Sequence, residues 1–522
     1  MVQTGNRKMK RLLGAIFVTF LVGWFGAGCA SYNKQTKNIN QSWESGNIQS
    51  AAAQVSAEAE KRKDTKDAVI WRLEQGAVLR AAGQLEESNH AFDMAEEMIN
   101  RFEEKAKVKV SHETLASVTN LTTLPYEGFA YDKIMMNTYK ALNYLELGDY
   151  EKARVEFNRA YERQDEAVQV NAARIEKAQE EGKRKNLYVD LEDVHNDGRF
   201  RNQFENNYAS LEQFKAYADY VNPLTVYLDA LFFMNQAAGF SDLERSRKSF
   251  ERVLGMVNES KFIHQDLETL QQVIEGHPIP ATTYVFFETG LAPEREQIRI
   301  DLPLFIVTPQ VPYVGAAFPK LKYRNSYLSG LYVSSEEMTE STLLLSNMDA
   351  VVTHEFKNVL PLIITKTLIA SALKAGAAYG AYAGMTNGGR NNPEAGLAVL
   401  IAGAITQVVM NQADLRTWTT LPKEFQVCRF PTPANRKIEL SAPDCGQKVP
   451  VILDEGVVNV VWVKSVNRNS PLLVKQFTLL KDNTKRDVPF EIPASKSIPL
   501  VESSRPEQST QKSEQTDKVN KS

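Results

Sequence analysis

Two short motifs hold the residues whose types and spacing could do chemistry. Glu288 lies two residues before the turn glycine Gly290, where a carboxyl group could act as an acid in a cleft or accept hydrogen bonds from loop amides. Asp414, Arg416 and Trp418 form the densest polar constellation of the chain. The spacing of two between Asp414 and Arg416 suits a helix end and a charged hydrogen bond better than acid–base work. We therefore interpret Glu288, Asp414, Arg416 and Trp418 as a structural cluster.

Other catalytic or metal-binding patterns do not occur in the sequence. None of the six histidines has the spacing of a metal ligand or of a base beside a nucleophile, and there is no glycine-rich phosphate loop or GxSxG elbow. Residues 193–198 imitate the start of a calcium loop, but the twelfth position is Phe204 where a bidentate glutamate is needed. We expect a solvated loop there, no metal, no cofactor and no enzymatic activity. A hydrolase stays as an alternative, which would need Glu288, Asp414 or a histidine in a deep pocket with a perturbed pKa.

Cys29 stands at the end of an export signal. Basic residues between positions 7 and 11 precede an apolar run, and small residues then lead into Cys29. The series resembles a bacterial lipoprotein signal, although Gly26 stands where that pattern usually has leucine. The resemblance implies that residues 1–28 are removed and that acyl chains such as palmitate are attached at Cys29. Ala30, in place of the aspartate of inner-membrane lipoproteins, favours an outer-membrane lipoprotein facing the periplasm. A plain cleaved signal and an uncleaved anchor remain alternatives.

Cys428 and Cys445 are the two other cysteines. Because an exported chain meets an oxidising compartment, a disulfide between them is the simplest interpretation, and two unpaired thiols are the alternative.

Composition sets broad limits. The 522 residues suggest two or three domains, and the net charge of −3, from 61 basic and 64 acidic side chains, gives no reason to expect a nucleic-acid partner.

A repeated spacing predicts paired helices in the first half of the chain. Gly46, Gly83 and Gly148 are each followed by hydrophobic, small and large residues at the same offsets, and a looser fourth copy follows Gly239. This is the tetratricopeptide pattern, in which a turn glycine separates two helices. The large core position is Phe92, Phe157 or Phe250 in the second, third and fourth copies. We predict a polar tether at residues 29–42 and a helical repeat domain at residues 43–276.

The pattern becomes alternating after residue 280 and predicts a β-rich, sandwich-like domain over residues 280–493, giving an α+β chain. The predicted strands cover residues 283–287, 297–301, 304–307, 341–346, 425–430, 437–440, 449–453, 457–463 and 471–479. A helical hairpin at residues 359–412 is inserted into this domain. Residues 494–522 are polar and are predicted to be disordered.

The hairpin could enter a membrane or lie against protein. Gly376, Gly380 and Gly384 recur every four residues, as in closely packed transmembrane helices. Lys366 and Lys374 interrupt the first helix, however, and the apolar run of the second helix is too short to span a bilayer. We predict that the hairpin lies against the β domain with its lysines towards water.

Three motifs resemble a family of largely uncharacterised bacterial lipoproteins, in which tetratricopeptide repeats precede a β domain. They lie at residues 219–223, 287–293 and 413–422, where the sequences are DYVNP, FETGLAP and ADLRTWTTLP. The resemblance implies no catalytic residues, and the repeats imply binding of protein segments.

These features lead to one expectation of function. The chain should be a lipid-anchored, non-enzymatic scaffold of the cell envelope, with the repeats forming a concave platform for a protein partner. A regulator that binds a cell-wall synthase is an alternative that rests on architecture alone. Oligomeric state is left open.

Overall fold

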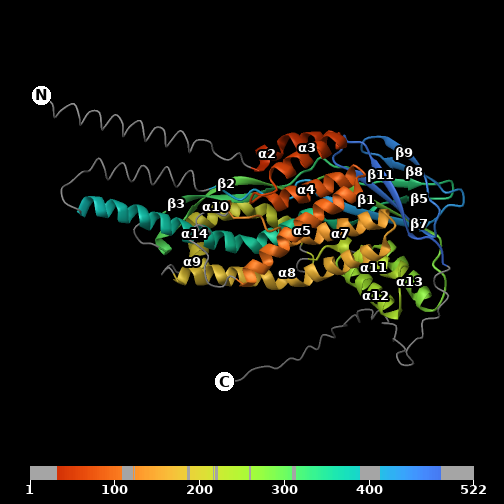
Figure 1. Ribbon diagram of the computed structural model, residues 1–522, viewed down its shortest axis with the longest axis horizontal. Coiled ribbons are helices and arrows are strands. Elements are labelled where there is room, and N and C mark those ends of the chain that lie inside the picture. The colour runs from red at the N-terminus through yellow and green to blue at the C-terminus, as the bar shows by residue number, and fades with distance from the viewer. Residues whose placement is uncertain are drawn as a thin grey trace, which may run out of the picture.

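The computed structural model describes residues 32–108, 122, 124–184, 189–215, 217, 221–257, 260–307, 313–387 and 412–483 (Figure 1). The signal peptide at residues 1–28, Cys29, the second helix of the hairpin and the tail at residues 494–522 lie outside the described residues.

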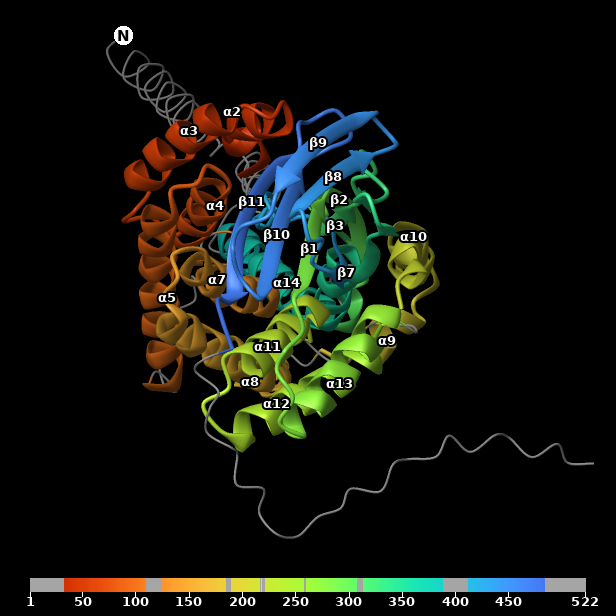
Figure 2. The same ribbon diagram turned by 90° about the vertical axis from the view of Figure 1, so that its right-hand side faces the viewer.

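Helices make up the N-terminal part of the described chain, and eight of them form four antiparallel pairs. The pairs are α2 (Tyr32–Glu44) with α3 (Ile48–Lys61), α4 (Ala68–Ala81) with α5 (Leu85–Val108), α7 (Ala130–Glu146) with α8 (Tyr150–Arg184), and α11 (Pro223–Asn235) with α12 (Phe240–Leu254). The helix α13 (Lys261–Ile274) ends this part. Figure 2 shows the pairs curving round the strands.

The turn between the helices of a pair confirms the glycine prediction. Gly46, Gly83 and Gly148 have φ of 76°, 82° and 75°, a region that glycine enters without strain. At Gly83 the amide donates to Arg80 and the next amide donates to Leu79, which is the Schellman pattern that ends a helix. Gly239 has an extended φ of −171°, in keeping with its looser copy of the repeat.

The predicted core positions are confirmed as well. Phe92, Phe157 and Phe250 are all buried. The Phe92 ring lies so close to Gly76 of α4 that a β-carbon there would collide with it. The small residue of the first helix therefore sets how closely the pair approaches.

The predicted tether is wrong, because residues 32–44 form α2. Tyr32, Thr36, Ile39 and Trp43 recur at helical spacing and are buried, so they form one face of the first helix of the first pair. The polar residues between them lie on the other faces, and they gave the segment its tether-like composition.

The predicted solvated loop around residue 195 is also helical. It contains α9 (Leu191–Asn196), α10 (Gly198–Tyr208) and the 3-10 turn η2 (Ala209–Gln213). Asp190 and Asp197 act as N-caps, accepting from the amides of Glu192 and Phe200 at 2.8 Å each. Asp197, one of the acidic residues that imitate a calcium loop, thus begins α10, and Asp190 begins α9.

The β-rich part contains a five-stranded sheet, a four-stranded sheet and a two-stranded ribbon. We call the five-stranded sheet the central sheet; its order is β11-β10-β1-β7-β6, with β1 parallel to β10 and antiparallel to β7. The outer sheet has the order β5-β4-β8-β9, and β2 pairs with β3. The strands are β1 (Thr282–Thr289), β2 (Glu294–Leu302), β3 (Val314–Lys322), β4 (Tyr332–Ser334), β5 (Thr339–Ser341), β6 (Leu343–Asn347), β7 (Glu424–Pro431), β8 (Lys437–Ala442), β9 (Gln447–Ile452), β10 (Val458–Ser465) and β11 (Leu473–Leu480).

Most predicted strands are confirmed within a few residues, and four elements differ. Residues 304–306 form a 3-10 turn (η3, Leu304–Ile306) instead of a strand. The strands β3, β4 and β5 have no predicted counterpart, apart from Ser341 at the end of β5. β3 carries Gly315 and Pro319, which depress strand propensity, and β4 has only three residues.

The inner strands β10, β1 and β7 of the central sheet are buried on both faces, which makes this sheet the middle of three layers. Alternate side chains of β1 point in opposite directions. Val285 and Phe287 join a core shared with the outer sheet, so the two sheets form the predicted sandwich. Tyr284 and Phe286 join the larger core that also contains Phe92, Tyr227 and other side chains of the helices. Helical repeats and central sheet therefore share one core.

The hairpin begins earlier than predicted, as α14 (Met348–Asn387), with Pro361 inside it. Leu360, Ile364 and Leu368 of the predicted apolar row are buried. The helix lies against α7, α8 and β3, so it contacts the repeats as well as the β-rich part. Lys366 is half-buried, whereas the burial of Lys374 and of Gly376, Gly380 and Gly384 lies outside what the structure describes.

One described helix, Met348–Leu373, is long and apolar enough to cross a membrane by length and composition alone, and 56% of its most apolar window is buried inside the protein. Core helices of this length meet the same criterion.

Candidate functional site

The inner face of the repeats holds a stretch of the chain's own backbone. We call residues 413–422 the internal segment; it forms neither helix nor strand, yet Thr417, Trp418, Thr420 and Leu421 are at most 1% exposed. It lies against the first helices of the second and third pairs, α4 and α7. We call the inner faces of these two helices the groove, and the internal segment covers them.

Glu74 of α4 binds the centre of the internal segment. One carboxylate oxygen accepts from the backbone and side chain of Thr419, at 2.6 Å each, and from the hydroxyl of Tyr32 at 2.9 Å. The other oxygen accepts from the backbone and side chain of Thr420, at 3.2 and 2.6 Å. A buried carboxylate with five donors fixes the position of the backbone turn at Thr419 and Thr420.

Arg416 binds the start of α4. Its guanidinium donates to both oxygens of Asp414, at 2.8 and 2.6 Å, to Asp67 at 3.0 Å and to the carbonyl of Leu124 at 2.9 Å. Burial alone would lower the pKa of Arg416, but the two carboxylates outweigh it and raise that pKa. The predicted hydrogen bond between Asp414 and Arg416 is present in the structure.

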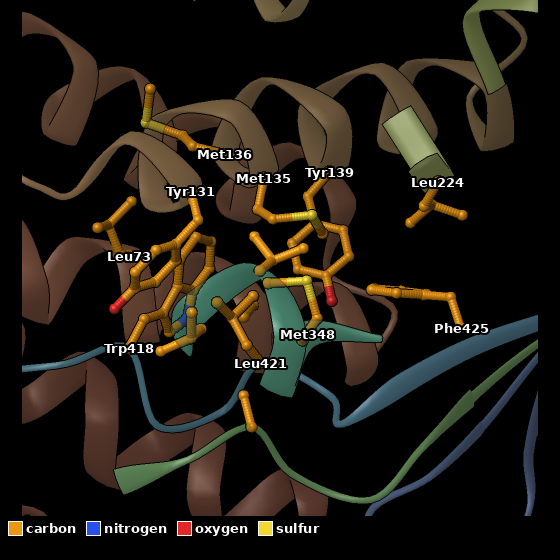
Figure 3. Close-up of a cluster of buried hydrophobic side chains, with 14 of the residues drawn as sticks. Leu73, Tyr131, Met135, Met136, Tyr139, Leu224, Met348, Trp418, Leu421 and Phe425 are labelled. Atoms are coloured by element: carbon orange, nitrogen blue, oxygen red, sulfur yellow. The ribbon is translucent and has the colours of Figure 1, made fainter. Parts of the chain in front are cut away.

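Trp418 fills an aromatic pocket between the second and third pairs (Figure 3). Its ring centroid lies 5.9 Å from that of Phe92 and 6.0 Å from that of Tyr139, and its indole N–H donates to Thr420 at 3.0 Å. Such ring pairs add about 0.5–1.5 kcal/mol beyond the area that they bury. Trp418 is therefore the apolar anchor of the internal segment.

Two of the motifs behind the family resemblance meet at this place. The amide of Ala292, in residues 287–293, donates to the carbonyl of Leu421 at 2.9 Å. Arg324 joins both motifs, because it donates to the carbonyls of Ala292 and Thr419 at 2.9 Å each. The motifs thus hold the groove and the central sheet together.

Carboxylates at the start of α7 complete the inner face. Glu355 of α14 accepts from the amides of Ala130 and Tyr131, at 2.7 and 3.0 Å, and so caps this helix. Asp132 accepts from the hydroxyl of Tyr126 at 2.5 Å and from the amide of Phe129 at 2.8 Å. Burial raises the pKa of Asp132 to about 7 despite these hydrogen bonds.

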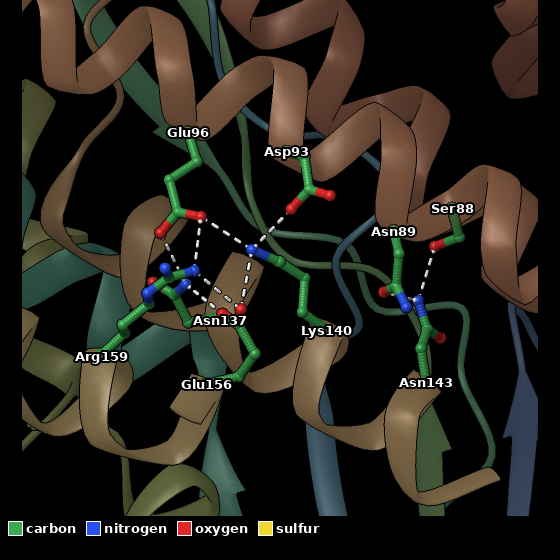
Figure 4. A network of polar contacts seen from close by, with 9 residues as sticks. All are labelled: Ser88, Asn89, Asp93, Glu96, Asn137, Lys140, Asn143, Glu156 and Arg159. Atoms are coloured by element: carbon green, nitrogen blue, oxygen red, sulfur yellow. Dashed lines mark hydrogen bonds and ion pairs between the residues drawn. The ribbon is translucent and has the colours of Figure 1, made fainter. Parts of the chain in front are cut away.

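A second polar cluster joins α5, α7 and α8 (Figure 4). The ammonium of Lys140, 1% exposed, lies 2.8 Å from Asp93, 2.7 Å from Glu96 and 2.9 Å from Glu156. These carboxylates outweigh burial and raise the pKa of Lys140, so it stays charged. The cluster fixes neighbouring helix pairs against each other.

The other end of α4 borders a small cavity, which we call the polar pocket. Its lining comes from α4, α7, β1, β10 and β11 and comprises Ala77, Arg80, Ala81, Tyr139, Glu288, Trp462, Lys464, Leu473 and Lys475. Glu288 accepts from the indole of Trp462 at 2.9 Å and forms an ion pair with Lys464.

The structure splits the predicted cluster into two places. Glu288 lies in the polar pocket beside Arg80 at the end of α4, whereas Asp414 and Arg416 lie at its start. The 14-residue helix separates them by roughly 20 Å, at 1.5 Å of rise per residue. Trp418 lies between the two places, because its ring contacts Tyr139, which also lines the polar pocket.

Cys428 and Cys445 are free thiols, so the predicted disulfide is not formed in the structure. Cys428 lies in β7 within the sandwich core, where burial raises the pKa of its thiol. Cys445 is in the turn after β8 and donates weakly to the carbonyl of Ala442. Their closeness in the sequence therefore did not lead to a bond between the two sulfurs.

Sequence reasoning missed Glu74, Arg80, Lys464 and Lys475. Arg80, Lys464 and Lys475 are charged residues inside mainly apolar runs of helix or strand, which is the signal that could have identified them, whereas Glu74 lies between Arg72 and Gln75 and lacks this signal. Glu74 follows Leu73 in a helix whose side chains are nearly all buried.

Metal binding finds no support in the described part of the chain, where no three histidine, cysteine or acidic side chains are placed to hold an ion.

No protein-family model matches the chain, and no curated protein is similar enough to count as a relative. The chain is similar to a solved tetratricopeptide repeat protein from Parabacteroides merdae, with 16% identity over 46% of this chain and 98% of that one. The TM-score of 0.13 is too low to carry an argument. The class therefore follows from the geometry above: the chain is an α+β protein with an N-terminal, tetratricopeptide-like helical array followed by a β-rich part.

Proposed function

We propose that this protein is a non-enzymatic scaffold that binds a protein partner in the cell envelope and is held at a membrane by lipid on Cys29. The observation that carries the proposal is the array of four helix pairs, whose inner face already binds one segment of the chain and whose outer helices are left for a second one. Glu74, Asp67 and the aromatic pocket around Trp418 provide the hydrogen bonds, charge and apolar anchor of peptide recognition.

The structure corrects the expectation of a free concave platform, because the internal segment occupies this groove. Displacing it would expose Trp418 and Leu421 and leave Glu74 buried without its donors, which costs several kcal/mol. A partner should therefore contact the outer helices α3, α5, α8 and α12. In this proposal the internal segment makes the helical array rigid, and the outer helices form the surface that the partner contacts.

The state of the polar side chains supports a scaffold over a hydrolase. Asp414 is engaged by Arg416, and Glu288 is engaged by Lys464 and Trp462. Each carboxylate thus has a structural partner that a catalytic acid or base would have to give up.

Crosslinking of the native protein in its membrane tests the proposal. Lys61 and Lys152, with side chains 70% and 63% exposed, lie on outer helices and should crosslink to the same partner in repeated experiments. Lys423, buried beside Asp349, is the internal control and should give no crosslink to the partner. Turnover of a substrate by the purified protein, or a partner that crosslinks only through Lys423, would contradict the proposal.

A further inference from the structure

The polar pocket contains more positive than negative charge. Arg80, Lys464 and Lys475 line it, and the carboxylates that face them are Glu288 and Glu146. Three cations thus share two anions. The net surplus is one positive charge at a place where the side chains of Arg80 and Lys464 are 6% and 11% exposed.

Both carboxylates that face these cations are already engaged. Glu146 lies 2.6 Å from Arg80 and 3.5 Å from Lys475, while Glu288 pairs with Lys464 and Trp462. The ammonium of Lys475 also donates a hydrogen bond to the backbone carbonyl of Arg80. Burial and the neighbouring charge of Arg80 lower the pKa of Lys475, in keeping with a cation that has too little negative charge near it.

The shape of the pocket limits what could supply the missing charge. Its cavity volume is about 20 Å³, room for one or two water-sized groups, and it is partly open, with the side chain of Lys475 22% exposed. The rings of Tyr139 and Trp462 form flat walls, each 5.8 Å from the Arg80 guanidinium. The two oxygens of a planar, singly charged group would occupy this space, with the rest of the group in the open side, and its charge would balance the surplus, whereas a phosphate dianion would overcompensate it.

We propose that the polar pocket binds a single carboxylate group, with Lys475 and Arg80 as its charge partners. The group belongs either to a small organic acid or to the C-terminus of a peptide, because both present the same planar anion. This site is distinct from the internal segment and does not depend on the outer helices that a partner is proposed to contact.

Saturation-transfer NMR on the whole protein at fixed ionic strength tests the proposal. The probes are acetate, the tripeptide Ala-Ala-Ala and the C-terminal amide of that tripeptide. Acetate should bind. Binding of the tripeptide acid at least as tightly, with none of the amide, assigns the site to a peptide C-terminus; binding of acetate alone assigns it to a small acid.

Two variants with opposite effects make the test decisive. Lys475→Met removes the surplus charge and should weaken acetate binding at least tenfold, whereas Glu146→Gln raises the surplus and should strengthen it severalfold. Lys448→Met removes an exposed lysine that pairs with Glu439 on the outer sheet, and it should leave binding unchanged. Circular dichroism confirms that each variant is folded. No binding of acetate to the unmodified protein, or equal binding by the Lys475→Met and Lys448→Met variants, overturns the proposal.

Discussion

At the scale of single residues, buried carboxylates connect neighbouring elements of this protein by accepting several hydrogen bonds each. Glu74, Asp132, Asp266 and Glu355 are buried, and each accepts hydrogen bonds from two or more donors. Because a buried carboxylate costs free energy unless it is bound on several sides, each one fixes the neighbours that bind it. The donors of Thr419 and Thr420 lie about 345 residues from Glu74, so the sequence does not reveal this pairing, whereas those of Asp132 lie within six residues of it.

Stability should fall as the pH rises through neutrality. Burial raises the pKa of Asp132 to about 7 and that of Asp266 to about 6, above the value of about 3.9 in an unfolded chain. The folded protein therefore holds these protons more tightly, and that stabilisation is lost as the pH rises through the folded values. Urea unfolding should give a free energy lower at pH 8.5 than at pH 5 by a few kcal/mol.

The Asp132→Asn variant is the control for this prediction, because it removes one of the two titrating groups and should reduce the pH dependence, leaving the part that Asp266 contributes. Glu96 and Glu103 have lowered pKa values, so they change the unfolding free energy only at more acidic pH. A stability that rises between pH 5 and pH 8.5 would contradict the assignment.

Truncation of a repeat core residue should be costly. Phe92→Ala leaves a cavity against Gly76, Tyr139 and Trp418 and should lower the free energy of unfolding by about 3–5 kcal/mol. Tyr161 on α8 is 42% exposed, so Tyr161→Ala should cost less than about 1 kcal/mol. Equal losses for the two variants, measured by denaturant unfolding, would show that the repeat register is misplaced.

At the scale of elements, the sequence predicted those whose burial is periodic and missed those whose burial depends on distant partners. The turn glycines and the strand β1 were predictable because Schellman turns and apolar runs are local signals. The internal segment has no periodicity, and its burial comes from Glu74, Phe92 and Tyr139 on other elements. Its motif could be noticed, but its place in the groove could not be derived.

Loss of the carboxylate of Glu74 should loosen the internal segment. In Glu74→Gln, one side-chain oxygen becomes an amide donor that faces the donors of Thr419 or Thr420, so the unfolding free energy should fall by about 2–3 kcal/mol. Hydrogen exchange should accelerate at the amides of both threonines. Glu60→Gln is the matched control, since the side chain of Glu60 is 61% exposed and its pairs are at the surface. Unchanged protection of the two amides would mean that Glu74 does not hold the segment.

At the scale of the whole molecule, attachment to the membrane rests on the sequence before Cys29. Cys29→Ser should prevent lipidation and release the mature protein from the membrane or stop its processing. Membrane fractionation after carbonate washing measures this, with Cys428→Ser as the control that leaves the N-terminus unchanged. If the Cys29→Ser variant is processed and retained as before, the anchor is not a lipid on this residue.

The shared core makes the helical array dependent on the strands. All thirteen residues of α11 are buried, and α7 is buried on almost every side, since their inner faces contact the central sheet and the internal segment. A chain cut to residues 32–276 would expose about ten large apolar side chains of these faces. At about 2 kcal/mol each, this loss exceeds the 5–15 kcal/mol that stabilises a typical domain.

We therefore expect residues 32–276 alone to keep helical circular dichroism but to lack a cooperative unfolding transition and to bind a hydrophobic dye. Residues 32–483, as the control, should unfold in one transition followed equally by far-ultraviolet circular dichroism and by tryptophan fluorescence, because Trp71 lies in the helices and Trp462 in the central sheet. A sharp, cooperative transition of the shorter chain would mean that the repeats fold independently, and the internal segment would then be a ligand of a preformed groove instead of part of its core.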